Sequence, residues 1–265
     1  MRSHWKFALP PTLAGGDAYA AQVRSALSTV GCDDVKVALT YGLLLDEVIA
    51  GTVDAAWMPP LLCARVEQRG GRVILRAIRG GTSTYRSVLF ARADRGLTLQ
   101  KLKGTTAAWL DQRSMSGYVL PRAQLRASGV IPEQTFAREK FLGSYLACVR
   151  AVLDGKVDVS ATFASAAAAA TARLGYVEML PERANELEPL AFSMECPHDG
   201  IVVGPRLSPE EAAEFAARFK RMLTDPAPAK VLYGALQVEG FDAPAAPGYG
   251  EAMKELLQET NGAAA

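Results

Sequence analysis

Two segments of the chain repeat one pattern, and this repeat constrains the fold more than any other feature. The first is residues 47–56 (EVIAGTVDAA), and the second is residues 151–160 (AVLDGKVDVS). In both, an apolar helix is expected to end at a glycine, and a Val-Asp pair leads into a strand of small residues. Gly155 follows Gly51 by 104 residues (155 − 51), about the size of one α/β lobe. The repeat therefore predicts two lobes of similar design.

Apolar runs and helical periodicities alternate along the rest of the chain, which predicts a parallel α/β sheet. Strands are predicted at residues 5–9, 35–40, 53–58, 73–78, 87–91, 105–110, 190–194 and 201–203. Helices are predicted at residues 17–30, 42–50, 119–128, 163–174, 209–223 and 250–259. Asp17 and Ser208 are the expected N-caps of two of these helices, and Pro209 suits the first turn after Ser208.

The overall composition excludes several classes of protein. Charged residues make up 22% of the chain and the net charge is +1, so nucleic-acid binding has no electrostatic support. No apolar run is long enough to span a membrane, and the first residues contain no apolar signal core. As written, the chain is expected in the cytoplasm, or in the periplasm if a leader was removed. Its widely spaced cysteines are expected to be free and buried: Cys32, Cys63, Cys148 and Cys196.

The stretch of residues 111–121 (DQRSMSGYVLP) has the composition of an anion site. It lies between a predicted buried strand and a predicted helix, whose first N–H groups have no partner within the helix. Ser114 and Ser116 add hydroxyl donors, Gly117 admits a close approach to the backbone, and Arg113 adds positive charge. The alternative is an ordinary helix cap at Ser114 with Arg113 in solvent, and spacing alone favours that alternative.

Several motifs together resemble the phosphonate- and phosphite-binding proteins of ABC transporters, which are type II periplasmic solute-binding proteins. They are residues 51–60 (GTVDAAWMPP), 85–90 (YRSVLF), 113–121 (RSMSGYVLP), 141–145 (FLGSY), 155–159 (GKVDV), 199–203 (DGIVV) and 240–242 (GFD). The resemblance implies an α/β fold with two lobes joined by two crossing strands. Residues 1–84 and 197–265 would form the first lobe, and residues 85–196 the second.

The resemblance also implies a set of ligand-binding residues. Phosphoryl oxygens would be held at Ser114-Met115-Ser116 and Gly117, with Arg113 adjacent. The other implied residues are Tyr41, Tyr85, Ser144 or Tyr145, and Asp199. For Tyr41 and Tyr85, half-buried aromatic residues without a ligand are the alternative. Trp57 and Trp109 lie in apolar runs and are expected in the core.

Two departures from the family pattern bear on the ligand. Met115 stands where the family has a hydroxyl residue, and this side chain suits a ligand with more apolar surface than phosphate has. Residues 161–165 (ATFAS) contain no carboxylate, although family members that bind aminoalkyl phosphonates use one there. The ligand is therefore not expected to carry an ammonium group.

The loop of residues 195–199 (ECPHD) collects a carboxylate, a thiol and an imidazole. A metal site needs three or four ligands, and His4 is the only other histidine in the chain, so no metal and no cofactor are expected. His198 could act as a general base, although a solvated histidine near a hinge is the simpler interpretation.

Three functions stay open on the sequence alone. The first is a binding protein whose two lobes close on a small oxyanion, with an ABC permease as partner. The second is a cytosolic enzyme of the lyase or dehydratase type on the same fold, for which the proton-transfer candidates are His198, Asp199, Tyr85 and Tyr145. The third is a ligand-sensing subunit that passes closure to a sensor partner. None involves nucleic acid or membrane insertion.

Overall fold

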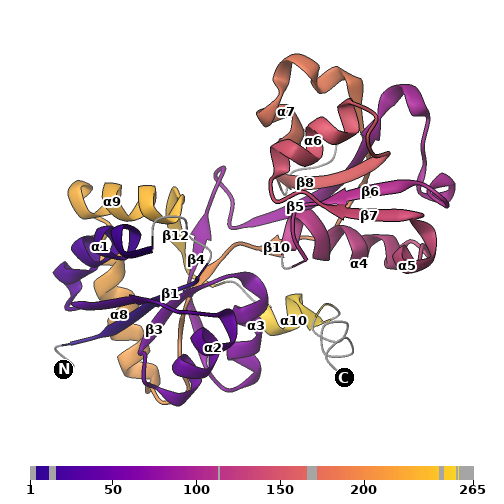
Figure 1. Cartoon of the computed structure of the whole chain (residues 1–265). Helices are drawn as coiled ribbons and strands as arrows, with labels where there is room; N and C mark the ends of the chain where they lie inside the picture. The colour runs from indigo at the N-terminus through magenta and orange to yellow at the C-terminus, as the bar shows by residue number, and fades with distance from the viewer. Residues whose placement is uncertain are drawn as a thin grey trace. The chain divides into compact units, whose positions relative to one another are not determined.

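The structure of the protein is a computed structural model that describes residues 4–11, 16–112, 114–165, 172–244, 248–254 and 256. Its internal contacts divide the chain into two compact units (Figure 1). Unit 1 is Met1–Ser83 with Pro197–Ala265, and unit 2 is Thr84–Cys196. The chain therefore passes between the units twice. Strand β10 (Cys196–Pro197) pairs with β5 (Thr84–Arg92), so hydrogen-bonded strands carry both crossings.

Unit 1 is built on a mixed sheet in the strand order β12-β4-β11-β3-β1-β2. Strands β1, β2 and β3 are parallel, whereas β11 runs antiparallel to both β3 and β4. The elements are β1 (Lys6–Leu9), α1 (Gly16–Leu27), β2 (Asp34–Val37), α2 (Tyr41–Ala50), β3 (Ala55–Met58), α3 (Pro60–Gln68), β4 (Arg72–Ile78), β11 (Gly200–Val203), α8 (Pro209–Met222), α9 (Pro226–Leu236), β12 (Gly240–Asp242) and α10 (Tyr249–Ala252).

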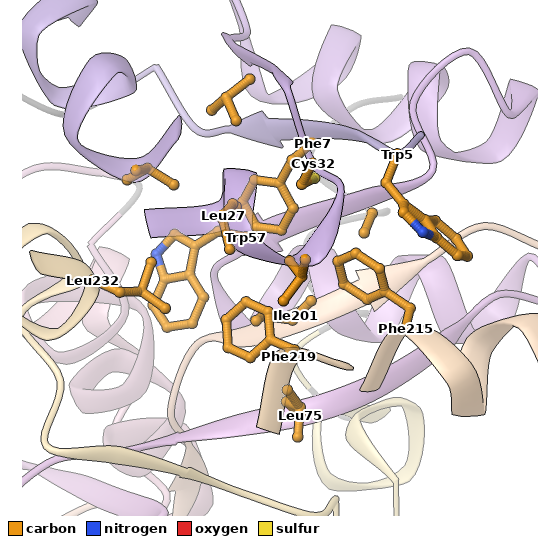
Figure 2. Packing of buried hydrophobic residues seen from close by; sticks show 14 of the residues in the cluster. Trp5, Phe7, Leu27, Cys32, Trp57, Leu75, Ile201, Phe215, Phe219 and Leu232 are labelled. Carbon is orange, nitrogen blue, oxygen red and sulfur yellow. The ribbon is translucent and has the colours of Figure 1, made fainter. Parts of the chain in front are cut away.

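One face of this sheet packs against α1, α8 and α9 in a hydrophobic core (Figure 2). Alternate strand residues point into the core, because successive side chains of a strand face opposite sides of the sheet. Trp5 packs on Phe215 of α8 with ring centroids 4.9 Å apart. Trp57 is 4% exposed, which confirms its predicted place in the core. Figure 2 also shows Phe7, Leu27, Leu75, Ile201, Phe219 and Leu232 in this core.

Unit 2 is built on a second mixed sheet in the strand order β10-β5-β8-β6-β7, with β9 paired to β5. Strand β6 is parallel to β7 and β8, whereas β5 is antiparallel to β8 and β9. Trp109 at the end of β6 is fully buried, as predicted. The other elements are β6 (Thr106–Trp109), a π-helical turn (Met115–Val119), α4 (Leu120–Ala127), α5 (Pro132–Thr135), β7 (Arg138–Phe141), α6 (Tyr145–Leu153), β8 (Val159–Ser165), α7 (Gly175–Met179) and β9 (Leu187–Phe192).

The sequence repeat corresponds to a repeated local structure. In unit 1, the Asp54 carboxylate accepts a hydrogen bond from the Lys6 N–H at 2.8 Å, and the Asp54 N–H donates to the Lys6 carbonyl at 3.0 Å. In unit 2, Asp158 and Thr106 form the same two bonds at 2.8 and 2.9 Å. Each aspartate therefore fixes the start of the neighbouring parallel strand, β1 or β6. This shared bonding gives the Val-Asp pair of the repeat a structural role.

The glycines of the repeat end their helices as predicted. Gly51 is the C-cap of α2 and has a φ of 69°, and Gly155 follows α6 with a φ of 67°. Both lie in the left-handed region, which glycine adopts without a Cβ clash.

Several sequence predictions were wrong in detail. The sheets are mixed rather than parallel. In unit 1 the returning strand β11 enters antiparallel between β3 and β4, and in unit 2 β5 runs antiparallel to β8 and β9. The predicted helix at residues 163–174 does not begin at Phe163, since β8 continues to Ser165 and pairs with β5 over its length. Gly175 begins a helix instead of closing one. Cross-strand pairing holds residues 163–165 in the strand, and residues 166–171, which contain the alanine run, lie outside the described residues.

The start of α8 agrees with the sequence prediction, whereas the start of α1 differs from it. Ser208 and Glu211 form a capping box at the start of α8, with Pro209 in its first turn. Helix α1 begins at Gly16, so Asp17 lies inside it rather than capping it.

All four cysteines are free and buried, as predicted. In the described parts of the chain, no helix is both long and apolar enough to cross a membrane.

Candidate functional site

Three hydroxyl groups of unit 2 meet beyond the end of β6. The Ser116 Oγ lies 2.7 Å from the Tyr145 hydroxyl oxygen, and the Ser114 Oγ lies 3.3 Å from the same oxygen. Ser116 is buried with 7% of its surface exposed, whereas Ser114 and Tyr145 are half-buried. We call these three groups the hydroxyl cluster. The structure thus brings together three of the predicted ligand-binding residues.

Ser114 caps the helical segment that follows it, as one interpretation of the sequence predicted. Its backbone is extended (φ −70°, ψ 120°), and its Oγ accepts a hydrogen bond from the Gly117 N–H at 3.1 Å. Because the oxygen accepts this bond, the hydroxyl proton stays available for donation to another group. The segment begins as a π-helical turn and continues into α4. Such turns often occur at functional sites.

Gly117 is required by close packing in this turn. A Cβ at this position would lie 2.7 Å from the Leu110 Cβ, 2.8 Å from the Ser114 Oγ and 3.2 Å from the Tyr145 Cε1. Glycine therefore allows the Ser114 hydroxyl and the Tyr145 ring to approach the same backbone segment.

Tyr145 is held at the start of α6. Ser144 is the N-cap of this helix, and its Oγ accepts from the Ala147 N–H at 3.2 Å. The Tyr145 ring meets the Phe163 ring edge-on, with centroids 5.8 Å apart. Burial raises the pKa of Tyr145, and the hydrogen bonds with Ser114 and Ser116 lower it by less. The phenol therefore stays protonated at neutral pH and can donate a hydrogen bond.

Ser87 supports the cluster from β5, and sequence reasoning missed it. Its Oγ donates to the Ser116 carbonyl oxygen at 2.6 Å and lies 3.2 Å from the Thr162 carbonyl oxygen. Ser87 is itself buried. A serine within an apolar strand carries no sequence signal for this role, because the bond joins segments distant in the chain.

Unit 1 contains a counterpart of the α6 start. Thr40 caps α2 by accepting from the Leu43 N–H at 3.1 Å, and Tyr41 follows it as Tyr145 follows Ser144. Ser144 follows Thr40 by 104 residues (144 − 40), the same spacing that separates the glycines of the repeat. Tyr41 is half-buried and makes further interactions. The repeat therefore extends back to a hydroxyl cap and a tyrosine in both units.

Asp199, in unit 1, is paired with a cation that sequence reasoning missed. The Arg79 Nη2 donates to the Asp199 Oδ2 at 2.7 Å, and the Arg79 Nε donates to the Gln237 carbonyl at 2.9 Å. The Arg79 guanidinium also lies over the Trp57 ring, 5.7 Å from its centroid. The Asp199 charge is therefore compensated within unit 1. The turn at residues 79–81 (RGG) gave no sign of this pairing.

His198 is buried beside the same arginine. It is 8% exposed, and its Nδ1 lies 3.4 Å from the Arg79 Nη1. Burial, and secondly the Arg79 charge, lower the pKa of His198 to about 3. The Tyr249 hydroxyl donates to the His198 carbonyl at 2.6 Å. Helix α10 is therefore hydrogen-bonded to the chain just after the second crossing. The structure shows a buried, neutral histidine instead of the solvated one that was expected.

The remaining predicted residues lie as follows. Met115 is half-buried in the π-helical turn, and Tyr85 is half-buried in β5, opposite Ser165 of β8. Arg113 lies outside the described residues. Of the proton-transfer candidates, His198 and Asp199 belong to unit 1, whereas Tyr85 and Tyr145 belong to unit 2. Within the described residues, no group of three or more His, Cys, Asp or Glu side chains is placed to hold a metal ion.

The chain matches one protein-family model, and its fold is similar to that of several solved structures. Residues 33–249 match the family model for the phosphonate periplasmic substrate-binding protein of ABC transporters. A search among curated protein sequences finds no relative.

Among solved structures, the fold is similar to three bacterial proteins. A Xanthomonas citri protein solved with ATP is 19% identical at a TM-score of 0.73, covering 98% of this chain and 99% of that one. A binding-protein component of a phosphonate ABC transporter from Pseudomonas aeruginosa is 21% identical at 0.66, covering 99% and 89%. PhnD1 from Prochlorococcus marinus, solved with methylphosphonate, is 18% identical at 0.65, covering 98% of each chain. These likenesses confirm the predicted two-lobed α/β fold of type II periplasmic binding proteins.

Proposed function

We propose, since this chain belongs to the family of periplasmic substrate-binding proteins of phosphonate ABC transporters, that Ser114 and Ser116 of its hydroxyl cluster hold the oxygens of a phosphonate- or phosphate-like ligand. The observation that carries the proposal is the capped helix start where Ser114 and Ser116 lie beside Tyr145. Hydroxyl donors and a helix N-terminus are groups that bind an oxyanion well, because both offer hydrogen atoms to negative oxygen.

The other residues implied by the family resemblance are also proposed to contact the ligand. Ser114, Ser116 and Gly117 would hold the oxyanion, and Met115 would contact its organic substituent. Tyr41 and Asp199 would contribute from unit 1, and Tyr85, Ser144 and Arg113 from unit 2. Support for Tyr41 comes from its place in the repeat, which matches that of Tyr145. The two units are proposed to be the two lobes of the family's fold.

The ligand is proposed to be an organic phosphonate without an ammonium group. Strand β8 ends in a carboxylate-free segment, and Asp199 already pairs with Arg79 at 2.7 Å. An ammonium group would have to displace Arg79 or remain uncompensated, and burying an unpaired charge is costly. Met115, and the exposed Leu39 and Leu43 close to Tyr41 in the sequence, offer apolar surface instead.

Methylphosphonate is therefore expected to bind at least about tenfold more tightly than aminomethylphosphonate, a difference of about 1.4 kcal/mol. Thermal-shift titrations with the two compounds and with inorganic phosphate measure this difference in affinity. A ligand at about 100 times its Kd stabilises the folded protein by about 2.7 kcal/mol, which raises its melting midpoint. Tighter binding of the amino compound would contradict the proposed ligand class. Absence of any shift with all three compounds would contradict the proposed function.

Ligand binding is proposed to close the two units about their paired crossings. The crossings lie at Ser83–Thr84 and Cys196–Pro197, and few chain segments there would need to change conformation. Small-angle scattering with and without saturating methylphosphonate is expected to show a smaller radius of gyration in the liganded protein. An unchanged radius despite binding confirmed by calorimetry would contradict closure.

Family membership supports a proposal for the macromolecular partner and for the compartment. An ABC permease is the proposed partner, and the periplasm is the proposed compartment in place of the cytoplasmic expectation. A sensor partner stays a prediction. Proton transfer by His198 has little support, because a group whose pKa is about 3 is a weak base near neutral pH.

A further inference from the structure

We infer that Tyr145 is a positioning residue: its hydroxyl donates to the Ser116 Oγ and thereby directs the Ser116 proton toward the ligand. The inference rests on the proposed function of the hydroxyl cluster, and it adds an order of donation within that cluster. Tyr145 then shapes ligand binding through Ser116 instead of holding a ligand oxygen itself.

The two contacts of the Tyr145 hydroxyl are unequal. The oxygen atoms of Tyr145 and Ser116 are 2.7 Å apart, the usual length of a hydroxyl–hydroxyl bond, whereas Ser114 is 3.3 Å away. Ser114 also accepts from the Gly117 N–H, so its oxygen already has a donor. Within the described residues, the Ser116 Oγ has its hydrogen-bond contact with Tyr145 and no other donor. The single Tyr145 proton therefore satisfies Ser116 best.

A count of protons gives the direction of donation when an anion is bound. Each hydroxyl has one proton and can accept through its lone pairs. An anionic oxygen only accepts, so both serines must turn their protons toward it. Ser116 then needs a donor for its own oxygen, and the protonated Tyr145 provides one. The resulting chain runs from Tyr145 through Ser116 to the ligand, and each bond in such a chain strengthens the next.

The surroundings hold this chain in place. The Ser87 hydroxyl fixes the Ser116 backbone at 2.6 Å, and the Phe163 ring packs against Tyr145 at 5.8 Å. Gly117 leaves room for the tyrosine ring, whose Cε1 would lie 3.2 Å from an added Cβ. Since the ring is held by packing, Tyr145→Phe removes the hydroxyl and keeps the ring contacts.

The test is a double-mutant cycle in affinity for methylphosphonate, measured by calorimetric titration, with thermal shift for the weakest variants. Tyr145→Phe is expected to weaken binding about three- to tenfold. In a Ser116→Ala background the same change is expected to have no further effect, because no Ser116 proton remains to be directed. In a Ser114→Ala background it is expected to keep its full effect. Tyr176→Phe, which removes another buried tyrosine hydroxyl of unit 2, is the matched control and should leave affinity unchanged.

Two results would overturn the inference. One is an affinity of Tyr145→Phe equal to that of the unmodified protein. The other is an equal loss in the presence and absence of Ser116, which would make Tyr145 a direct ligand contact. Melting of each unliganded variant separates these effects from loss of folding. If the unmodified protein binds neither methylphosphonate nor phosphate, the proposed function itself is wrong, and the inference is rejected with it.

Discussion

Replacing Gly117 by alanine is expected to weaken methylphosphonate binding at least tenfold and to lower the free energy of unfolding by about 1–3 kcal/mol. The added Cβ would lie 2.7 Å from the Leu110 Cβ, which the backbone holds in place. It would also lie 2.8 Å from the Ser114 Oγ and 3.2 Å from the Tyr145 ring. Relief of these contacts must move the residues that form the hydroxyl cluster, so stability and affinity fall together.

Gly234→Ala is the matched control for this change. Gly234 lies within α9 of unit 1, and a Cβ there would meet no atom within 4 Å. Alanine in a helix is more favourable than glycine by about 0.5–1 kcal/mol, so this variant should be slightly more stable and bind as before. Calorimetric titration and unliganded melting of both variants make the comparison. Unchanged affinity of Gly117→Ala would show that ligand binding does not depend on the geometry of the cluster.

Local signals in the sequence predicted much of the scaffold. Gly51 and Gly155 end helices in the left-handed conformation, which glycine adopts easily, and Ser208 caps α8 through its side-chain hydroxyl. Helices α3 and α9 were missed, although Pro60 and Pro226 begin them as proline often does.

Features that depend on distant segments could not be predicted. Residues 163–165 were predicted to begin a helix, but they extend β8, which pairs with β5 as far as Ser165. The placement of β11 between β3 and β4 follows from the return of the chain to unit 1. The pairing of Arg79 with Asp199 joins residues 120 positions apart, and no local pattern indicates it.

The candidate site was predicted in part. Ser114, Ser116 and Gly117 stood out because hydroxyl residues and glycine follow a strand and precede a helix. Tyr145 was implied by the family resemblance, and the structure places its hydroxyl against both serines. The support from Ser87 was missed, because its hydroxyl reaches the Ser116 backbone from another strand.

Ser116→Ala is expected to weaken ligand binding ten- to a hundredfold. A charge-assisted hydrogen bond from a hydroxyl to an oxyanion contributes about 1.5–3 kcal/mol, and the Ser116 environment is largely closed to water, with 7% of the residue exposed. The same substitution breaks the bond with Tyr145, so the free energy of unfolding should fall by at most about 1 kcal/mol.

Ser160→Ala provides a matched control for Ser116→Ala. The Ser160 hydroxyl is buried in the same unit and donates to the Ala108 carbonyl at 2.7 Å. Its loss should lower stability by about 1 kcal/mol and leave affinity unchanged.

The most direct test of an oxyanion site at the hydroxyl cluster is calorimetric titration of Ser116→Ala with methylphosphonate, beside melting of the unliganded variant. A ten- to hundredfold loss of affinity, with melting no more affected than in Ser160→Ala, is the predicted result. Lowered melting with unchanged affinity would contradict the account, since Ser116 would then hold Tyr145 in place without binding the ligand.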